Sequence, residues 1–316
     1  MRKTILHQHI EAFQQQRRIQ AGSLIVSVFG DAILPRGGRI WLGSLIRLLA
    51  PLNVNERLIR TSIFRLAKDE WLATEASGRR ADYFLTASGR RRFEQAAEHI
   101  YAGSTALWDR RWRLILTVGE IAAKQRELLR RALFWQGFGL LSPTCFIHPS
   151  VDLSAAFDAL TAEGLEDHLP ALMPLLAADT ELNNSASQAD LVRQAWNLEE
   201  LASAYENFVQ CYQPMLKVLR NTTPDESEDE HAFLLRTLLI HNYRRLLLRD
   251  PGLPDVLLPK GWPGQKARTL CKEMYLHLLP ASERHLQRTM QTANGDTPAA
   301  LTMLTQRFQS TASLSK

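Results

Sequence analysis

The sequence predicts an α+β protein of several domains, and three observations lead to this prediction. Helical periodicity dominates the first hundred residues, with two short β-rich segments near their middle. Strand-like and helical segments then alternate, and helical patterns fill most of the rest. We therefore expect an N-terminal arm (1–20), a winged helix-turn-helix domain (21–110), a ferredoxin-like α/β middle domain (111–190) and a mostly helical C-terminal domain (191–316).

The charge of the chain is unevenly distributed. The net charge is only +5, but residues 1–113 carry +9 and residues 151–231 carry −13. This asymmetry predicts that the N-terminal part approaches a polyanion, while the acidic stretch keeps the rest of the molecule away from it.

The sequence carries no sign of a membrane span or of export. No apolar run approaches the ~20 residues that a span needs, and the N-terminus lacks the apolar core of a signal peptide. The three cysteines lie far apart and form no CxxC pair, which fits a reducing compartment. We therefore expect a cytoplasmic protein with no membrane partner.

The first domain begins with two apolar helical segments. Ser23 is expected to cap the first of them, and the breaker PRGGR at 35–39 separates it from the second, at 40–51. A third helix, at about 56–69, follows a short turn and is expected to be capped by Asn55. Its apolar positions recur every three to four residues, so they would pack on the two preceding helices.

A hairpin and a fourth helix complete this domain. The β-rich segments 71–76 and 81–86 flank Gly78, which permits a tight turn between two strands. Thr86 is expected to cap the helix that follows. Three helices, a hairpin and a helix are the order of a winged helix-turn-helix domain.

The third helix carries basic side chains opposite its apolar positions. Such a helix fits the major groove of DNA, where Arg can contact guanine and flanking cations contact phosphates. For an isolated helix, a solvated surface is the ordinary interpretation. The two helices before it, the basic hairpin tip and the positive charge of the segment favour DNA binding instead. The predicted contacts to double-stranded DNA are Asn55, Arg57, Arg60, Thr61, Arg65 and Lys68 on the helix, and Arg79 and Arg80 at the hairpin tip.

The remaining segments follow two patterns. A strand at 112–119, a helix at 120–137, a second strand with a Pro-containing bend at 139–149 and a helix at 151–164 give a β-α-β-α order. This order predicts a ferredoxin-like α/β fold. Helices are then expected at 191–216, 225–250 and 265–280, and the residues after about 294 are loosely specified.

Three stretches of the chain resemble a known family. They are RGGRIWLGSLIRLLAPLNVNERLIRTSIFRLAKDEWL, SGRRADYFLTASGRRRF and LLIHNYRRLLLRDPGLPDVLLPKGWPG. They are similar to the PaaX family of repressors of phenylacetate catabolism, and the resemblance extends from about Ser23 to Leu279. It implies a GntR-like winged helix, a ferredoxin-like middle domain and a helical C-terminal domain for effector binding and dimerisation. It also implies a homodimer that binds operator DNA and releases it when phenylacetyl-CoA binds.

The C-terminal part contains residues that suit such an effector. A coenzyme A thioester carries several phosphate charges, so its site needs Arg or Lys beside an apolar slot. The alternative is structural, with the arginines stabilising the negative end of a helix dipole and the Pro/Trp loop bracing two helices. The predicted effector contacts are His241, Tyr243, Arg244, Arg245, Arg249, Trp262 and Lys266.

Enzyme motifs are missing from the sequence. There is no HExxH, GxSxG, GxxxxGK[ST] or GxGxxG pattern, so we expect no catalytic residue, no metal site and no cofactor. The first hypothesis is a ligand-responsive transcriptional repressor. One alternative is an enzyme, an acyl-CoA hydrolase or a nuclease, joined to a DNA-binding domain. Another is a constitutive architectural DNA-binding protein without a ligand.

Overall fold

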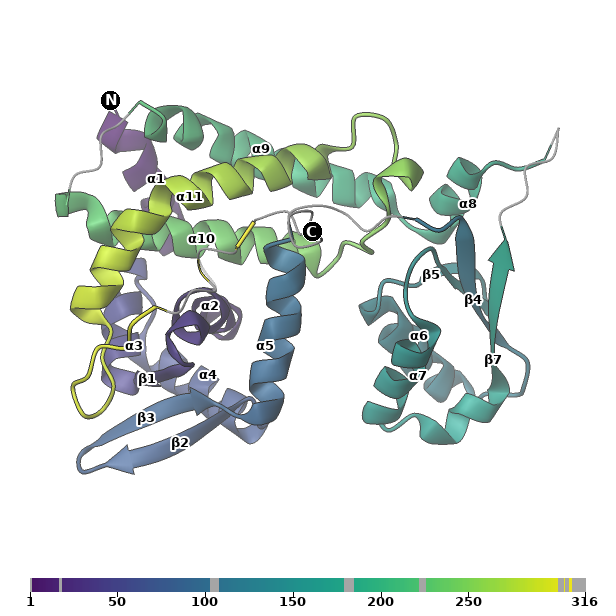
Figure 1. The fold of residues 1–316 in the computed structure, drawn as a ribbon, viewed down its shortest axis with the longest axis horizontal. Coiled ribbons are helices and arrows are strands. Elements are labelled where there is room, and N and C mark those ends of the chain that lie inside the picture. Colours follow the sequence, from purple (N-terminus) through teal and green to yellow (C-terminus); the bar gives the residue numbers. More distant parts are fainter. Residues whose placement is uncertain are drawn as a thin grey trace, which may run out of the picture. The chain divides into compact units, whose positions relative to one another are not determined.

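The computed structural model of the chain describes residues 2–16, 19–102, 108–178, 185–221 and 226–300, together with Leu304, Arg307 and Phe308. Two compact units are present, each built from parts of the chain that are distant in sequence (Figure 1). Unit 1 comprises residues 1–103, 207–245 and 265–316, and unit 2 comprises residues 104–206 and 246–264. The domain limits predicted from the sequence stay predictions. In the described ranges, the helices are too short or too polar to cross a bilayer.

The predicted arm is largely a packed helix. Helix α1 (Arg2–Gln14) buries Leu6, Ile10 and Phe13, which recur at helical spacing on one side. The Gln14 side chain donates a hydrogen bond to the carbonyl oxygen of Pro51 at 2.7 Å. The first residues of the chain are therefore part of the core of unit 1, and residues 17 and 18 lie outside the described ranges.

Helix α2 (Ala21–Val28) is the most deeply buried helix of the N-terminal part, with Leu24 and Ile25 fully inaccessible to solvent. It continues as a π-helical turn and a 3-10 turn to residue 36. The prediction that Ser23 caps α2 is wrong, because the helix already begins at Ala21. Ser23 lies in the first turn, where its hydroxyl accepts a hydrogen bond from Arg244 at 2.7 Å.

The predicted second helix begins later than expected. Gly37, with φ at +87°, ends the preceding turn, and strand β1 (Arg39–Trp41) comes before helix α3 (Leu42–Leu49). β1 pairs antiparallel with a strand more than 40 residues away, so its backbone hydrogen bonds go to a sheet. A 3-10 turn at 50–52 then leads to Asn53, whose positive φ turns the chain toward the next helix.

The remaining N-terminal elements follow the predicted order. Helix α4 (Glu56–Lys68) is capped by Asn55, whose side chain accepts the Arg57 N–H at 2.7 Å. Strands β2 (Leu72–Ser77) and β3 (Arg80–Leu85) form a tight hairpin with Gly78 at φ +59°, and the sheet order is β1-β3-β2. Figure 1 shows this hairpin extending beyond the helices of unit 1. Helix α5 (Ala87–Ile100) is capped by Thr86, as predicted.

Three long helices from the C-terminal part contribute most of their length to unit 1. They are α9 (Leu198–Leu219), α10 (Asp229–Leu247) and α11 (Pro263–Thr289). The predicted helix at 191–216 is in fact two helices, because Trp196 has an extended backbone between α8 (Gln188–Ala195) and α9. Helix α11 continues beyond its predicted end, with Pro280 inside it.

A buried network of charges lies in the centre of unit 1. The Arg236 guanidinium is fully buried and donates to Asp31 at 2.7 Å and to Glu283 at 2.8 Å. Asp31 also accepts hydrogen bonds from Arg307 at 2.7 Å and from the Tyr101 hydroxyl at 2.6 Å. These cationic partners hold the pKa of Asp31 below its usual value, although burial alone would raise it. The network joins the turn after α2 to α10, α11 and the C-terminal segment.

Unit 2 is a sheet with two helices on one face. Its strands are β4 (Arg111–Thr117), β5 (Gly139–Ser142), β6 (Cys145–His148) and β7 (Leu172–Ala178), and its two helices are α6 (Ala123–Trp135) and α7 (Leu153–Ala162). All pairings are antiparallel and the order is β5-β6-β4-β7. Ile115 and Phe146 of the sheet share a core with Leu133 of α6 and Leu160 of α7. This is the predicted ferredoxin-like arrangement.

Two details of unit 2 differ from the prediction. The segment 139–149 is a hairpin of two strands, turning at residues 143–144, and is not one bent strand. Strand β7 was not predicted, although it forms a complete seven-residue ladder with β4. Pro174 is tolerated there because β7 is an edge strand.

Candidate nucleic-acid interface

Helix α4 is held in place by its apolar side. Ile59 and Ile63 are buried, with exposed fractions of 0% and 1%, and the helix packs against α2. The contact with α2 is close at Gly22, where a β-carbon would lie 3.7 Å from the hydroxyl of Ser62. One side of α4 therefore packs against the rest of unit 1, and the opposite side of the helix is exposed.

All the predicted contact residues of α4 lie on its solvent side. Arg57, Arg60, Thr61, Arg65 and Lys68 are exposed on the same helix, and together they form a positive surface. The guanidinium of Arg60 pairs with Glu56, one turn earlier, at 2.7 Å, and both side chains are more than half exposed. The structure places these residues together, and their role in DNA binding stays a prediction.

Two predicted contact residues have their polar groups engaged within the helix. The Asn55 side-chain oxygen is occupied by the cap of α4. The Thr61 hydroxyl donates to the carbonyl oxygen of Arg57 at 2.8 Å, one turn earlier. Sequence reasoning did not select Phe64, although this large apolar side chain is 69% exposed on the same helix.

The hairpin tip also presents both predicted arginines at the surface. Arg79 is exposed at the turn. Arg80 stacks its guanidinium on Trp41, 4.5 Å from the ring centroid, and donates to the carbonyl oxygen of Ala293 at 3.4 Å. Asp82 of β3 accepts the N–H of Ala293 at 2.6 Å. The hairpin therefore contacts the segment that follows α11, and no local sequence pattern indicates this contact.

Two predicted effector residues on α10 contact α2 instead of an open pocket. The ring nitrogen Nδ1 of His241 lies 3.1 Å from the Ser27 hydroxyl. Arg244 donates to the hydroxyl groups of Ser27 and Ser23, at 3.1 and 2.7 Å. Burial, followed by the charges of Arg244 and Arg245, lowers the pKa of His241 to about 4, so the ring is neutral near pH 7.

The other predicted effector residues are distributed over both units. In unit 1, Tyr243 is buried beside Phe208, whereas Arg245 and Lys266 are exposed. In unit 2, Arg249 pairs with Glu200, and Trp262 packs edge-on against Tyr205 at 6.0 Å. The effector role of these residues stays a prediction.

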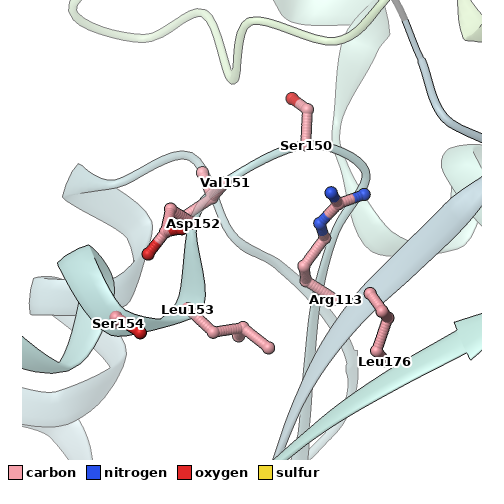
Figure 2. Close-up of a pocket in the computed structure, with 7 residues that line it drawn as sticks. All are labelled: Arg113, Ser150, Val151, Asp152, Leu153, Ser154 and Leu176. Carbon is pink, nitrogen blue, oxygen red and sulfur yellow. The ribbon is translucent and has the colours of Figure 1, made fainter.

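Unit 2 has an open hollow of about 300 Å³ between β4 and the start of α7. Figure 2 shows Arg113 on one side of it and Asp152 on the other. Arg113 already forms two hydrogen bonds with Asp109, at 2.6 and 2.8 Å, and Asp152 caps α7 by accepting the Ala155 N–H. Both charged side chains therefore serve the fold. In the described part of the chain, His, Cys, Asp and Glu side chains do not gather in threes as a metal site would require.

Comparisons with known proteins cover most of the chain. Three family models match it: PaaX-like protein over residues 20–89, PaaX protein central Cas2-like domain over 105–183, and PaaX-like protein C-terminal domain over 196–288. The transcriptional repressor PaaX of Escherichia coli (strain K12) is 38% identical over 293 residues, which are 92% of this chain and 90% of that protein. A solved structure, the uncharacterized protein Rv0674 from Mycobacterium tuberculosis, is 22% identical and matches with a TM-score of 0.48 over 76% of this chain and 88% of its own.

Proposed function

Since this chain belongs to the PaaX-like protein family, we propose that it is a transcriptional repressor of phenylacetate catabolic genes. It acts in the cytoplasm by binding double-stranded operator DNA, and phenylacetyl-CoA releases it. The observation that carries the proposal is the exposed basic side of α4, on a helix whose other side is buried in unit 1.

In this proposal α2, α3, α4 and the hairpin β2–β3 form a winged helix-turn-helix. Helix α4 enters the major groove, where Arg57, Arg60 and Arg65 reach base edges or phosphates. The hairpin is the wing, and Arg79 and Arg80 at its tip meet the DNA backbone or the minor groove. Two copies related by a two-fold axis would bind half-sites about 10–10.5 bp apart, or a multiple of that distance.

Contacts within unit 1 support a route from the effector to α4. Arg244 and His241 of α10 contact Ser23 and Ser27 of α2, and α2 packs against α4. An effector that displaces the end of α10 would therefore displace α2, and α4 with it. The ligand acts by binding the displaced arrangement better than the DNA-binding one.

Fluorescence anisotropy on the promoter of the phenylacetate genes tests the proposal. We expect the full chain to bind this duplex and to dissociate from it when phenylacetyl-CoA is added, whereas free coenzyme A has no effect on binding. Undiminished binding at saturating phenylacetyl-CoA would contradict the induction mechanism. Equal affinity for the promoter and for unrelated DNA would contradict the repressor assignment itself.

The contribution of α4 is tested by Arg57→Ala. We expect weaker binding and a slope of log affinity against log salt that is smaller by ~1 if Arg57 meets a phosphate. Arg193→Ala is the matched control, because Arg193 is 73% exposed on α8 of unit 2, where it pairs with the neighbouring Asp190 at the surface. If the two substitutions weakened binding equally, α4 would not be part of the DNA-binding surface.

A further inference from the structure

The outward side of α4 is not uniformly polar. Phe64 is 69% exposed, although it is one of the most apolar side chains on the helix. It lies between basic side chains, with Arg60 one turn before it and Lys68 one turn after it. Single exposed apolar side chains are common on protein surfaces, so the exposure of Phe64 alone does not mark an interface; its position in the middle of the proposed DNA-contacting side is what gives it a role.

Thr61 presents a second apolar group on the same side. Its hydroxyl is turned back to the carbonyl oxygen of Arg57 at 2.8 Å, so this hydroxyl is already used within the helix. The methyl group is then the part of the exposed Thr61 side chain that remains for an external contact.

These two groups form the middle of one ridge. Arg57, Thr61, Phe64 and Lys68 are spaced at i, i+4, i+7 and i+11, which places them on one line along the helix, opposite the buried Ile59 and Ile63. Thr61 and Phe64 are separated along the axis by about 4.5 Å, from a rise of about 1.5 Å per residue. Base pairs follow each other at about 3.4 Å, so the two groups match neighbouring base pairs.

The major groove offers one apolar group, the C5-methyl of thymine, and Thr methyl groups and Phe rings are suited to contact it. We propose that the Thr61 methyl and the Phe64 ring contact thymine methyl groups on adjacent base pairs, so that they select thymine at these positions. The flanking cations Arg57 and Lys68 then meet phosphates or other bases. This inference rests on the proposed DNA-binding function and adds a source of sequence preference to it.

Replacing thymine by uracil tests the contact directly, because uracil lacks only the methyl group. Duplexes that bind the full-length chain are selected from a random library, and each thymine of the selected site is replaced by uracil in turn. We expect about a fourfold loss of affinity at the contacted positions, as for the burial of about one methyl group.

Pairs of variants assign the contact to its residues. Thr61→Ser keeps the hydroxyl and removes the methyl, so it should abolish the effect of uracil at one position, whereas Thr61→Val keeps the methyl and should retain the effect. Phe64→Ala should abolish the effect at the neighbouring position, and Phe64→Leu should keep part of it. Leu58→Ala is a control, since Leu58 is exposed on the flank of the ridge and should leave the uracil effect unchanged. Melting temperatures show that each variant is folded.

The outcomes separate this inference from the function on which it rests. If the library yields no enriched sequence, the repressor function fails and this inference fails with it. If a site is enriched but no uracil substitution weakens binding, only this inference is wrong. The same conclusion follows if the Thr61→Ser and Phe64→Ala variants lose as much affinity on uracil substitution as the unmodified protein does. A change in sedimentation of Phe64→Ala with an unchanged uracil effect would assign Phe64 to a contact between two copies.

Discussion

Acidification should destabilise unit 1 through His241, and the size of the effect follows from its surroundings. The imidazole lies beside Ser27, and its burial, together with the charges of two nearby arginines, lowers its pKa to about 4 from the ordinary value of 6.5. The unfolded chain therefore binds a proton at a pH where the folded chain does not. Stability from His241 is fully present above pH 6.5 and is lost as the pH falls toward 4.

The expected loss can be worked out from the two pKa values. At about 1.36 kcal/mol per pKa unit, the total effect is ~3 kcal/mol, of which ~2 kcal/mol is already lost between pH 7.5 and pH 5. Urea unfolding of the full chain at these two pH values measures it. His241→Gln removes the titrating group, so its free energy of unfolding should change by ~2 kcal/mol less over the same interval.

The comparison of pH dependences, not of absolute stabilities, makes this prediction specific. The pKa of His148 in unit 2 is also lowered to about 4 by burial, but His148 is present in both proteins and its contribution cancels. Equal pH dependence of His241→Gln and the unmodified protein would show that His241 is not buried in the folded state as described.

Three further predictions concern stability. Asn55→Ala removes the cap of α4 and should lower the free energy of unfolding by ~1 kcal/mol in urea; no change would mean that the cap is replaced by water. Gly89→Ala would place a β-carbon 2.1 Å from the carbonyl oxygen of Trp71, so a loss of ~1–3 kcal/mol or more is expected in thermal unfolding, and a neutral effect would contradict this packing. Arg236→Ala should cost ~3–5 kcal/mol because it leaves Asp31 buried with fewer partners, and a loss below ~1 kcal/mol would show that Arg307 and Tyr101 satisfy Asp31 without Arg236.

The elements predicted correctly are those with a local signal. Helix α4 has an apolar period, a capping Asn55 and a charged outer side within 15 residues, so its limits and orientation follow from nearby sequence. The hairpin β2–β3 has Gly78 at the turn, where positive φ is needed. Thr86 acts as the cap of α5 for the same local reason.

The elements that were missed depend on distant partners. Residues 40 and 41 of strand β1 were included in a helix because they share the apolar period of α3, and only the pairing of β1 with β3 separates them. Strand β7 consists largely of apolar residues around Pro174, and a proline in such a segment argues against a strand when the segment is considered alone. The strand that pairs with it, β4, lies about 60 residues earlier in the chain. Such pairings decide secondary structure against local preference.

The residues predicted to bind the effector illustrate the same limit at the level of function. His241 and Arg244 suit a ligand by chemistry, but each contacts a serine of α2 more than 200 residues earlier. No sequence pattern marks these serines, since Ser23 reads as a helix cap. A charged or aromatic residue therefore indicates a binding site only when its partners within the fold are known.

The same contacts decide how a signal could pass through unit 1. Helix α2 contacts α10 through Ser23 and Ser27, while Gly22 brings another side of it close to α4. Because α2 is short and buried in a packed core, we expect a shift imposed at its contacts with α10 to be passed on to α4. Under the proposed function, release of DNA would require only a displacement of α4 relative to its half-site, and the buried core of unit 1 would stay intact. In that proposal the response to the ligand needs no unfolding of unit 1, because α4 lies at the surface and the charged network lies in the interior.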